Sequence, residues 1–236
     1  MKKHILIIGS GSIGQRHAKN LISLNCDVSI VDPRQDRLDD SIKLFNVKNS
    51  YINIDQALNN AKYDGSIICS PTKYHLSQAT ALLEKKIPIM MEKPVSIDYN
   101  SAKEFKVFLK DNSCEDLFML GYTWRWWKAL IKMRKLINDS IIGKEYHAQY
   151  FMSAHLADWH PWEPYQDFFM SSKELGGGAL LDESHWIDQM VWFFGLPDAI
   201  SATVDTISDL DITSDDSVEL IASYKNGLKV FIHLDI

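Results

Sequence analysis

The sequence has few cysteines and no long apolar run. Three cysteines occur in 236 residues and none forms a CxxC pair, which argues against a disulfide framework or a zinc knuckle and fits a reducing cytoplasm. The apolar run after Lys2 and Lys3 ends at Gly9 without a cleavage site of small residues. It therefore predicts a buried strand rather than a signal peptide. No stretch approaches the ~20 apolar residues of a membrane span, so we expect a cytoplasmic protein with no membrane partner.

Basic clusters, internal repeats and low-complexity segments are also missing. The formal net charge is −6 and no basic stripe is present, so nucleic acid is not an expected partner. A hydrophobic content of 46% and a charged content of 24% are ordinary for a soluble globular protein. The length allows one large domain or two domains of ordinary size.

The first distinctive pattern lies near the N-terminus. Residues 5–8 form an apolar run, Gly9, Gly11 and Gly14 follow as GxGxxG, and a helical pattern then leads to a second apolar run that ends at Asp32. Strand, glycine turn, helix, strand and acid in this order predict a dinucleotide-binding βαβ unit. The alternative is a glycine-rich turn of a doubly wound fold that binds no dinucleotide.

The residues of this unit have separate expected roles. Gly9 permits the tight turn, Gly11 lets the backbone approach a pyrophosphate, and Gly14 lets helix and strand pack closely. Asp32 is placed to accept hydrogen bonds from ribose hydroxyls and to repel a 2′-phosphate, which favours NAD over NADP. Arg34 lies two residues further on and offers a partner for a phosphate, so NADP remains an alternative cofactor.

Short apolar strands alternate with helical patterns up to about residue 122. This alternation predicts an α/β fold, with an N-terminal Rossmann domain over residues 1–122 whose doubly wound parallel sheet is covered on both faces. The expected strands lie near residues 4–9, 27–32, 47–52, 65–69, 87–91 and 116–121.

Residues 123–236 predict a second, α+β domain with a mainly antiparallel open sheet. Its expected helices cover residues 128–137 and about 180–194, a long aromatic loop spans residues 156–174, and strands begin near 146 and cover 200–207, 217–224 and 228–234. Asn226-Gly227 predicts a hairpin turn. The chain stops in or just after a strand pattern, so we expect a C-terminally short domain and a homo-oligomer formed through the C-terminal sheet.

Several separated motifs together resemble one family. In chain order they are Ser70-Pro71-Thr72 with His75, Glu92-Lys93-Pro94, Gly121-Tyr122 with Arg125, and Gly176-Gly177-Gly178 with Asp182, His185 and Asp188. They resemble the Gfo/Idh/MocA family of NAD(P)-dependent oxidoreductases over nearly the whole chain. The resemblance implies a Rossmann domain with an open-faced sheet domain, a small-molecule substrate of the sugar or polyol type, and frequent oligomers.

The resemblance also implies which residues form the site. The reaction is carried by Lys93, Asp182 and His185. The cofactor contacts Gly9, Gly11, Ser12, Ile13, Gly14, Asp32, Arg34, Ser70, Pro71, Thr72, His75, Glu92 and Lys93. The substrate contacts Tyr122, Arg125, Trp159, Tyr165, Asp182 and His185, and no metal is expected. Asp182 and His185 are three residues apart where many members have four, and this stretch resembles members linked to nucleotide-sugar and surface-glycan metabolism.

The chemistry of these residue types is consistent with that resemblance. Oxidation of a secondary alcohol needs a base for the hydroxyl proton as the hydride leaves, and a histidine pKa of ~6.5 suits that task near neutrality. The i, i+3 spacing of Asp182 and His185 places both on one face of the expected helix. Lys93 follows a buried strand, where its ammonium can stabilise a developing alkoxide.

Each of these residues also has a plain structural interpretation. A lone lysine is usually a solvated surface residue, a lone histidine is often buried and satisfied, and His75 fits a helix start beneath the cofactor. The clustered tryptophans fit a core, an interface or a sugar-stacking surface, and a core is the default interpretation. His155, Asp158 and His160 form an HxxDxH pattern that fits a metal site, although no further ligand has suitable spacing.

Two other functions remain as alternatives to a dehydrogenase. The first is a non-catalytic dinucleotide-binding sensor or regulatory protein on the same fold, because one fold hosts many functions. The second is an internal redox reaction with a tightly held cofactor, which would survive purification.

Overall fold

A computed structural model describes residues 2–159, 161 and 163–236. The chain divides into two compact units, Met1–Gly121 and Tyr122–Ile236, and each is described here by itself. In the described part of the chain, no helix is both long and apolar enough to cross a bilayer.

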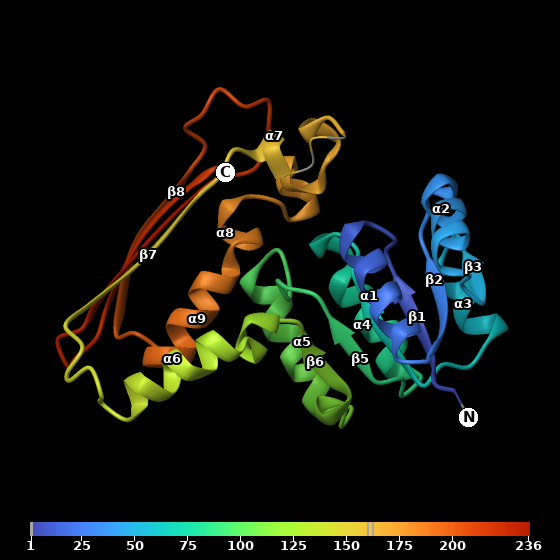
Figure 1. Cartoon of the computed structure of the whole chain (residues 1–236), viewed down its shortest axis with the longest axis horizontal. Coiled ribbons are helices and arrows are strands. Elements are labelled where there is room, and N and C mark those ends of the chain that lie inside the picture. Colours follow the sequence, from blue (N-terminus) through green and yellow to red (C-terminus); the bar gives the residue numbers. More distant parts are fainter. Residues whose placement is uncertain (1, 160, 162) are drawn as a thin grey trace. The chain divides into compact units, whose positions relative to one another are not determined.

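The first unit is built on a six-stranded parallel sheet (Figure 1). Its strands are β1 (His4–Ile8), β2 (Asp27–Val31), β3 (Asn49–Tyr51), β4 (Gly65–Ile68), β5 (Ile89–Met91) and β6 (Phe118–Leu120). They lie in the order β3-β2-β1-β4-β5-β6, and every pair is parallel. This is the doubly wound order whose reversal beside β1 creates the crevice at the carboxyl ends of the strands. The predicted α/β class is confirmed.

Helices cover both faces of this sheet. They are α1 (Ser12–Ser23), α2 (Gln35–Phe45), α3 (Ile54–Asn60), α4 (His75–Glu84) and α5 (Tyr99–Asp111), with short 3-10 turns at Thr72–Tyr74 and Glu115–Leu117. Successive residues of β1 enter different cores: Leu6 packs in a cluster with Leu82 of α4, and Ile7 in a cluster with Ala18 of α1. Side chains alternate across a strand, so an unbroken apolar run is what a sheet buried on both faces needs.

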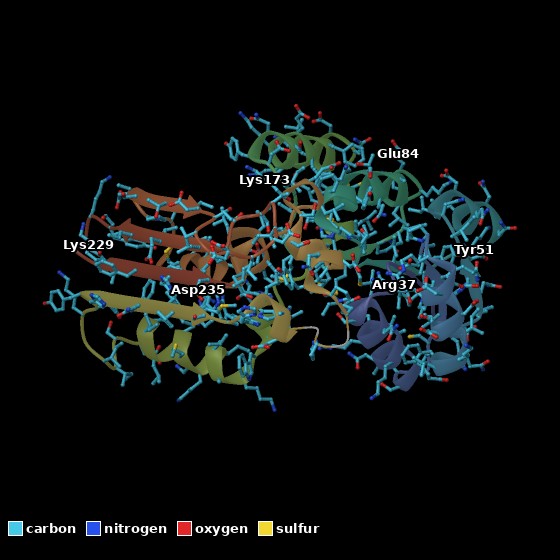
Figure 2. All side chains as sticks on the ribbon, turned by 90° about the horizontal axis from the view of Figure 1, so that it is seen from above. Arg37, Tyr51, Glu84, Lys173, Lys229 and Asp235 are labelled. Carbon is cyan, nitrogen blue, oxygen red and sulfur yellow. The ribbon has the colours of Figure 1, made fainter. Side chains whose placement is uncertain are left out.

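The second unit contains a four-stranded mixed sheet. Its strands are β7 (His147–Ser153), β8 (Ala199–Asp205), β9 (Ser217–Ser223) and β10 (Lys229–Asp235), in the order β7-β10-β9-β8. The β10–β9 and β9–β8 pairs are antiparallel, and β7–β10 is parallel. Lys229 and Asp235, both labelled in Figure 2, mark the two ends of β10. The mainly antiparallel sheet is therefore confirmed, and Gly227 closes the predicted β9–β10 hairpin at φ +96°.

Helices cover one face of this second sheet. The helices of the unit are α6 (Lys128–Asn138), α7 (Leu156–Trp159), α8 (Ala179–Asp182) and α9 (Ser184–Phe194), with 3-10 turns η3 (Thr123–Trp126), η4 (Tyr165–Asp167), η5 (Phe169–Ser171) and η6 (Lys173–Leu175). The inward residues of β9 and β10, such as Leu220 and Ile232, form a core with Met190 of α9. Outward residues such as Ile221 and Phe151 are 42% and 63% exposed.

The structure corrects one element of the sequence interpretation. The helix expected over residues 180–194 is broken at Glu183, so Asp182 ends α8 and His185 lies in the first turn of α9. Glu183 has φ −87° and ψ +16°, outside the regular helix. The assumption that Asp182 and His185 share one face of a single helix is therefore wrong. The expected loop between residues 156 and 174 also contains a short helix and several 3-10 turns.

Candidate functional site

The glycine turn between β1 and α1 has the geometry that a dinucleotide needs. A Cβ on Gly14 would lie 1.9 Å from the Gly9 carbonyl oxygen, so α1 can start this close to β1 only with glycine there. Gly9 has φ +95°, and a Cβ on it would lie 2.7 Å from the backbone of Cys69. At Gly11 the nearest atom to an added Cβ is Nη1 of Arg37, at 3.8 Å, so the surface above this residue has room for another group.

The start of α1 fits a bound phosphate. Its N-cap is Gly11, and no side chain caps the helix. The first N–H groups of a helix have no partner within the helix and carry a partial positive charge. An anion such as a pyrophosphate satisfies both properties. The residues present therefore fit a dinucleotide, with Ser12 and Ile13 in the first turn.

Asp32 follows β2 and is held in a fixed position. Its side chain is 3% exposed and accepts hydrogen bonds from the backbone N–H groups of Ser10 (2.7 Å) and Arg34 (2.9 Å). A carboxylate oxygen has more than one lone pair, so these bonds leave capacity for ribose hydroxyls. The guanidinium of Arg34 is engaged with Asp36, with Nε donating to Oδ1 at 3.1 Å.

The loops that follow β4 and β5 are tied together by His75. This side chain is 1% exposed, with Nε2 at 2.8 Å from the Ser70 carbonyl oxygen and Nδ1 at 2.8 Å from that of Pro94. Burial lowers the pKa of His75. A neutral imidazole has one N–H and donates to one of these oxygens at a time. Thr72 is 3% exposed and Pro71 precedes it, so this segment is part of the scaffold at the sheet edge.

Glu92 forms a contact that the sequence analysis did not anticipate. Its Oε1 lies 2.9 Å from Nε2 of His17, and both side chains are less than a fifth exposed. His17 lies in α1, three residues after Gly14. The pair joins the glycine-turn helix to the loop that carries Lys93, which is partly buried and precedes Pro94 through a cis peptide bond. The sequence feature that could have indicated this pair is His17, one helical turn beyond Gly14.

In the second unit, aromatic rings surround His185. The ring of Trp124 is stacked on the imidazole, with centroids 4.6 Å apart and planes 7° apart. Tyr122 meets the imidazole edge-on at 5.6 Å, and its hydroxyl donates to Oγ of Ser184 at 3.3 Å. Burial raises the pKa of Tyr122, so this phenol is a neutral hydrogen-bonding group at physiological pH.

Arg125 also lies beside α9 through a bidentate ion pair. Its Nε and Nη2 donate to the two carboxylate oxygens of Asp188 at 2.9 and 2.6 Å. The hydrogen bond to Asp188 raises the pKa of Arg125. Asp188 is three residues after His185, so the pair fixes η3 against the same turn of α9. Arg125 keeps 43% of its side chain exposed and remains accessible.

The remaining predicted site residues of the second unit are all partly buried. Asp182 is partly buried at the end of α8. Trp159 and Tyr165 pack against the core of the second unit, and Oη of Tyr165 accepts a hydrogen bond from the backbone of Asp211 at 3.1 Å.

The HxxDxH pattern is only partly described by the structure. His155 and Asp158 belong to the described residues, and His160 lies outside them. No three His, Cys, Asp or Glu side chains within residues 2–159, 161 and 163–236 are grouped to hold a metal ion.

Asp215 is a further residue that sequence reasoning missed. Its Oδ2 accepts a hydrogen bond from the backbone N–H of Leu180 at 2.8 Å, at the start of α8. Gly178 has φ +112°, and a Cβ on it would lie 2.4 Å from Oδ1 of Asp215. A Cβ on Gly177 would lie 2.4 Å from the Met170 carbonyl oxygen. The glycine run therefore allows two close approaches just before Asp182.

Comparisons with known proteins agree along the chain. A model of the "Oxidoreductase family, NAD-binding Rossmann fold" matches residues 3–122, and one of the "GFO/IDH/MocA C-terminal domain" matches residues 130–236. The chain is 26% identical over 140 residues to a myo-inositol 2-dehydrogenase of Thermotoga maritima. That match covers 58% of this chain and 41% of the relative, so it spans less than half of the relative's length.

Two solved structures show the same fold. A myo-inositol 2-dehydrogenase from Lactobacillus plantarum superposes with a TM-score of 0.87 and 19% identity, covering 100% of this chain and 70% of that one. The WlbA dehydrogenase from Bordetella pertussis was solved with NADH and UDP-GlcNAcA. It superposes with a TM-score of 0.83 and 17% identity, covering 100% of this chain and 71% of that one.

Proposed function

This chain belongs to the Gfo/Idh/MocA oxidoreductase family, with an NAD-binding Rossmann fold over residues 3–122, and we propose that it is an NAD-dependent sugar or polyol dehydrogenase. It would transfer a hydride between nicotinamide and a secondary alcohol or ketone of a sugar, polyol or nucleotide sugar. The observation that carries the proposal is His185, held by the rings of Tyr122 and Trp124. An imidazole held in one orientation supports a proton-transferring enzyme over a protein that only senses a dinucleotide.

The proposed roles follow from the chemistry of three side chains. NAD, when bound, supplies the acceptor for the hydride. His185 takes the hydroxyl proton, because imidazole is the side chain that most often serves as a general base near neutrality. The ammonium of Lys93 stabilises the alkoxide as it develops. Asp182 is proposed to favour the protonated imidazole by its negative charge, acting from the end of a neighbouring helix.

The cofactor choice is proposed from Asp32 and Arg34. The buried carboxylate of Asp32 repels a 2′-phosphate, and the guanidinium of Arg34 is engaged with Asp36. We therefore expect NAD to bind more tightly than NADP. Titration of both cofactors followed by Trp fluorescence measures this, and Asp32→Ala should narrow the preference while Arg34→Ala leaves it unchanged. A clear NADP preference in the unaltered chain would make Arg34 a phosphate ligand instead.

The substrate class, assembly and location are also proposed. Structural relatives include an inositol dehydrogenase and a dehydrogenase solved with a nucleotide sugar, which supports screening both kinds of substrate. Phe151 and Ile221 are exposed apolar side chains on the outward face of the second sheet, which supports a homo-oligomer formed through that face. The free cysteines support a cytoplasmic location.

The decisive experiment measures reduction of NAD by the purified chain with a panel of inositols, aldoses and UDP-sugars. With an active substrate, Lys93→Ala and His185→Ala should each lower kcat by ~10²–10⁴ while NAD binding stays largely intact. His147→Ala, on the outward face of β7, is the matched control and should keep full activity.

Three results would contradict parts of this proposal. Full activity of His185→Ala would make Tyr122 or Asp182 the candidate base. Tight NAD binding with no reduction by any substrate would favour the sensor. Cofactor that survives purification and is reduced only transiently would favour an internal redox reaction.

A further inference from the structure

The indole of Trp124 is stacked on one face of the His185 imidazole. The two rings are nearly parallel, 7° apart, with centroids at 4.6 Å. The indole is itself braced, because Trp186 meets it edge-on at 4.8 Å and 89°. Trp126, two residues away on the same 3-10 turn, is 71% exposed. Trp124 is partly buried, so two tryptophans of one short segment have different environments.

Several bonds hold the segment of Trp124 against the start of α9. Tyr122 donates to Ser184, and Arg125 pairs with Asp188. Nε1 of Trp186 donates to Oε2 of Glu183 at 2.9 Å. These contacts lie on both sides of Trp124 in sequence and on both sides of His185 in α9. The stacked geometry is thus fixed by anchored neighbours and does not depend on the two rings alone.

A stacked aromatic face has two physical effects on an imidazole. It restricts rotation about the bond to the ring, so that the two nitrogens keep one orientation. It also stabilises the protonated ring more than the neutral one, because the indole face carries negative electrostatic potential and tryptophan is the strongest such partner. A base that must accept a proton in one direction benefits from both effects.

We infer that Trp124 is a positioning residue for His185, holding the imidazole in its working orientation and stabilising it once it has taken the proton. The inference rests on the proposed role of His185 as the base. Trp124 itself is not assigned any contact with the reacting atoms. Its proposed role is to orient the side chain of His185, which in turn acts on the substrate.

Other charged or titratable groups lie on the elements packed around this ring. Tyr122 and Arg125 flank Trp124, and Asp182, Glu183 and Asp188 lie on α8, on α9 or between them. All of them stay in place in the variants proposed below. A change in the titration of His185 is then assigned to the loss of the indole.

The test compares Trp124→Leu, Trp124→Phe and the matched control Trp126→Leu. The titration of His185 is followed by NMR of the imidazole, with its signal identified by its loss in His185→Gln. In Trp124→Leu the proton affinity of His185 should fall about three- to tenfold, and its signal should show averaging between ring orientations. Trp124→Phe should give an intermediate value, and Trp126→Leu should match the unaltered chain.

Kinetics with an active substrate give the second readout. Trp124→Leu should lower kcat about tenfold with little change in KM and should shift the acid limb of the pH profile downward. Trp124→Phe should recover part of this loss, and NAD affinity should stay the same in all three variants.

The NMR arm decides the inference even where activity does not. An unchanged His185 titration in a folded Trp124→Leu protein overturns it. If that variant does not fold, an unchanged titration in Trp124→Phe does so. Full turnover of His185→Gln would instead refute the proposed base while leaving the stacking result as measured.

Discussion

The two sheets of this protein bury their strands in different ways. In the first unit, Leu6 and Ile7 are both 0% exposed, although they point to opposite faces of β1. In the second unit, Leu220 is 7% exposed and its neighbour Ile221 is 42% exposed. A sheet covered on both faces has room for candidate site groups only in the loops at the carboxyl ends of its strands, where Asp32 and Lys93 lie. A sheet covered on one face leaves the side chains of its other face exposed and available for contacts.

The candidate site groups are held differently in the two units as well. In the first unit, hydrogen bonds to the backbone fix them: Asp32 accepts two N–H groups, and His75 bridges two carbonyl oxygens. In the second unit, contacts between side chains fix them, as with the stack of Trp124 on His185 and the polar bonds that anchor its segment. Backbone turns tolerate few substitutions at glycine positions, whereas an aromatic cluster tolerates replacement of one ring by another of similar shape.

An alanine scan of neighbouring strand residues tests most directly whether the two sheets differ in how they bury their strands. Leu6→Ala and Ile7→Ala should each lower the free energy of unfolding by about 2–5 kcal/mol, because both leave cavities in closed cores. Leu220→Ala should cost the same, and Ile221→Ala less than about 1 kcal/mol. Urea unfolding followed by circular dichroism measures all four.

Two outcomes would change the comparison. A small cost at Ile7 would mean that one face of the first sheet is less well packed than its burial indicates. A concentration-dependent loss at Ile221 would mean that this residue is covered in an assembly, which size-exclusion chromatography with light scattering would reveal. The second outcome would support the proposed oligomer.

A second test compares glycines of the two units. Gly14→Ala places a methyl group against backbone, 1.9 Å from the Gly9 oxygen. This substitution should lower the free energy of unfolding by about 3 kcal/mol. It should also weaken NAD binding. Gly227→Ala meets no atom within 4 Å and suffers only from its φ of +96°, which costs about 1 kcal/mol. Thermal unfolding with and without NAD separates the two. Equal effects would show that strain, not collision, governs both positions.

The smallest expected effect is that the stabilities of the two units change in opposite directions with pH. Burial lowers the pKa of His75 below its ordinary 6.5. Partial burial also opposes charge on His233, but hydrogen bonds to Glu219 and Asp235 outweigh it and raise the pKa of that ring. As the pH falls below 6.5, the unfolded chain takes up a proton at position 75 before the folded chain does, so the first unit loses stability. The contribution of His233 is complete below 6.5 and is lost as the pH rises through its raised pKa.

Hydrogen exchange of peptides from each unit, between about pH 5 and pH 8, measures these two slopes. His75→Gln and His233→Gln are the controls, each compared with the unaltered chain at the same pH to remove the intrinsic pH dependence of exchange. Each substitution should flatten the slope of its own unit only. A common slope in both units would contradict the assignment.

The sequence allowed most of the first unit to be predicted. Apolar runs such as residues 65–69, the glycine spacing around Gly11 and the acid at Asp32 are local patterns, and local patterns determine strands, turns and their order. The second sheet was also predicted in outline, because Asn226-Gly227 fixes the register of a hairpin.

Contacts between distant residues could not be predicted in the same way. The His17–Glu92 pair spans 75 positions, and Asp215 approaches Leu180 across 35. The break at Glu183 was missed because apolar residues keep helical spacing on both sides of it. The stack of Trp124 on His185 depends on how η3 and α9 pack, which no periodicity in either segment expresses.

The parallel pairing of β7 with β10 also bears on how the protein is made. His147 pairs with Lys229, and Ser153 with Asp235, so the first strand of this sheet receives its partner about 80 residues later in synthesis, which takes several seconds at typical rates. The first unit is complete by residue 121 and can fold while the ribosome is still translating. During those seconds β7 presents Tyr150 and Phe151 without a neighbouring strand. In the interval after the ribosome passes residue 153, the nascent chain is therefore exposed to aggregation through an unpaired strand.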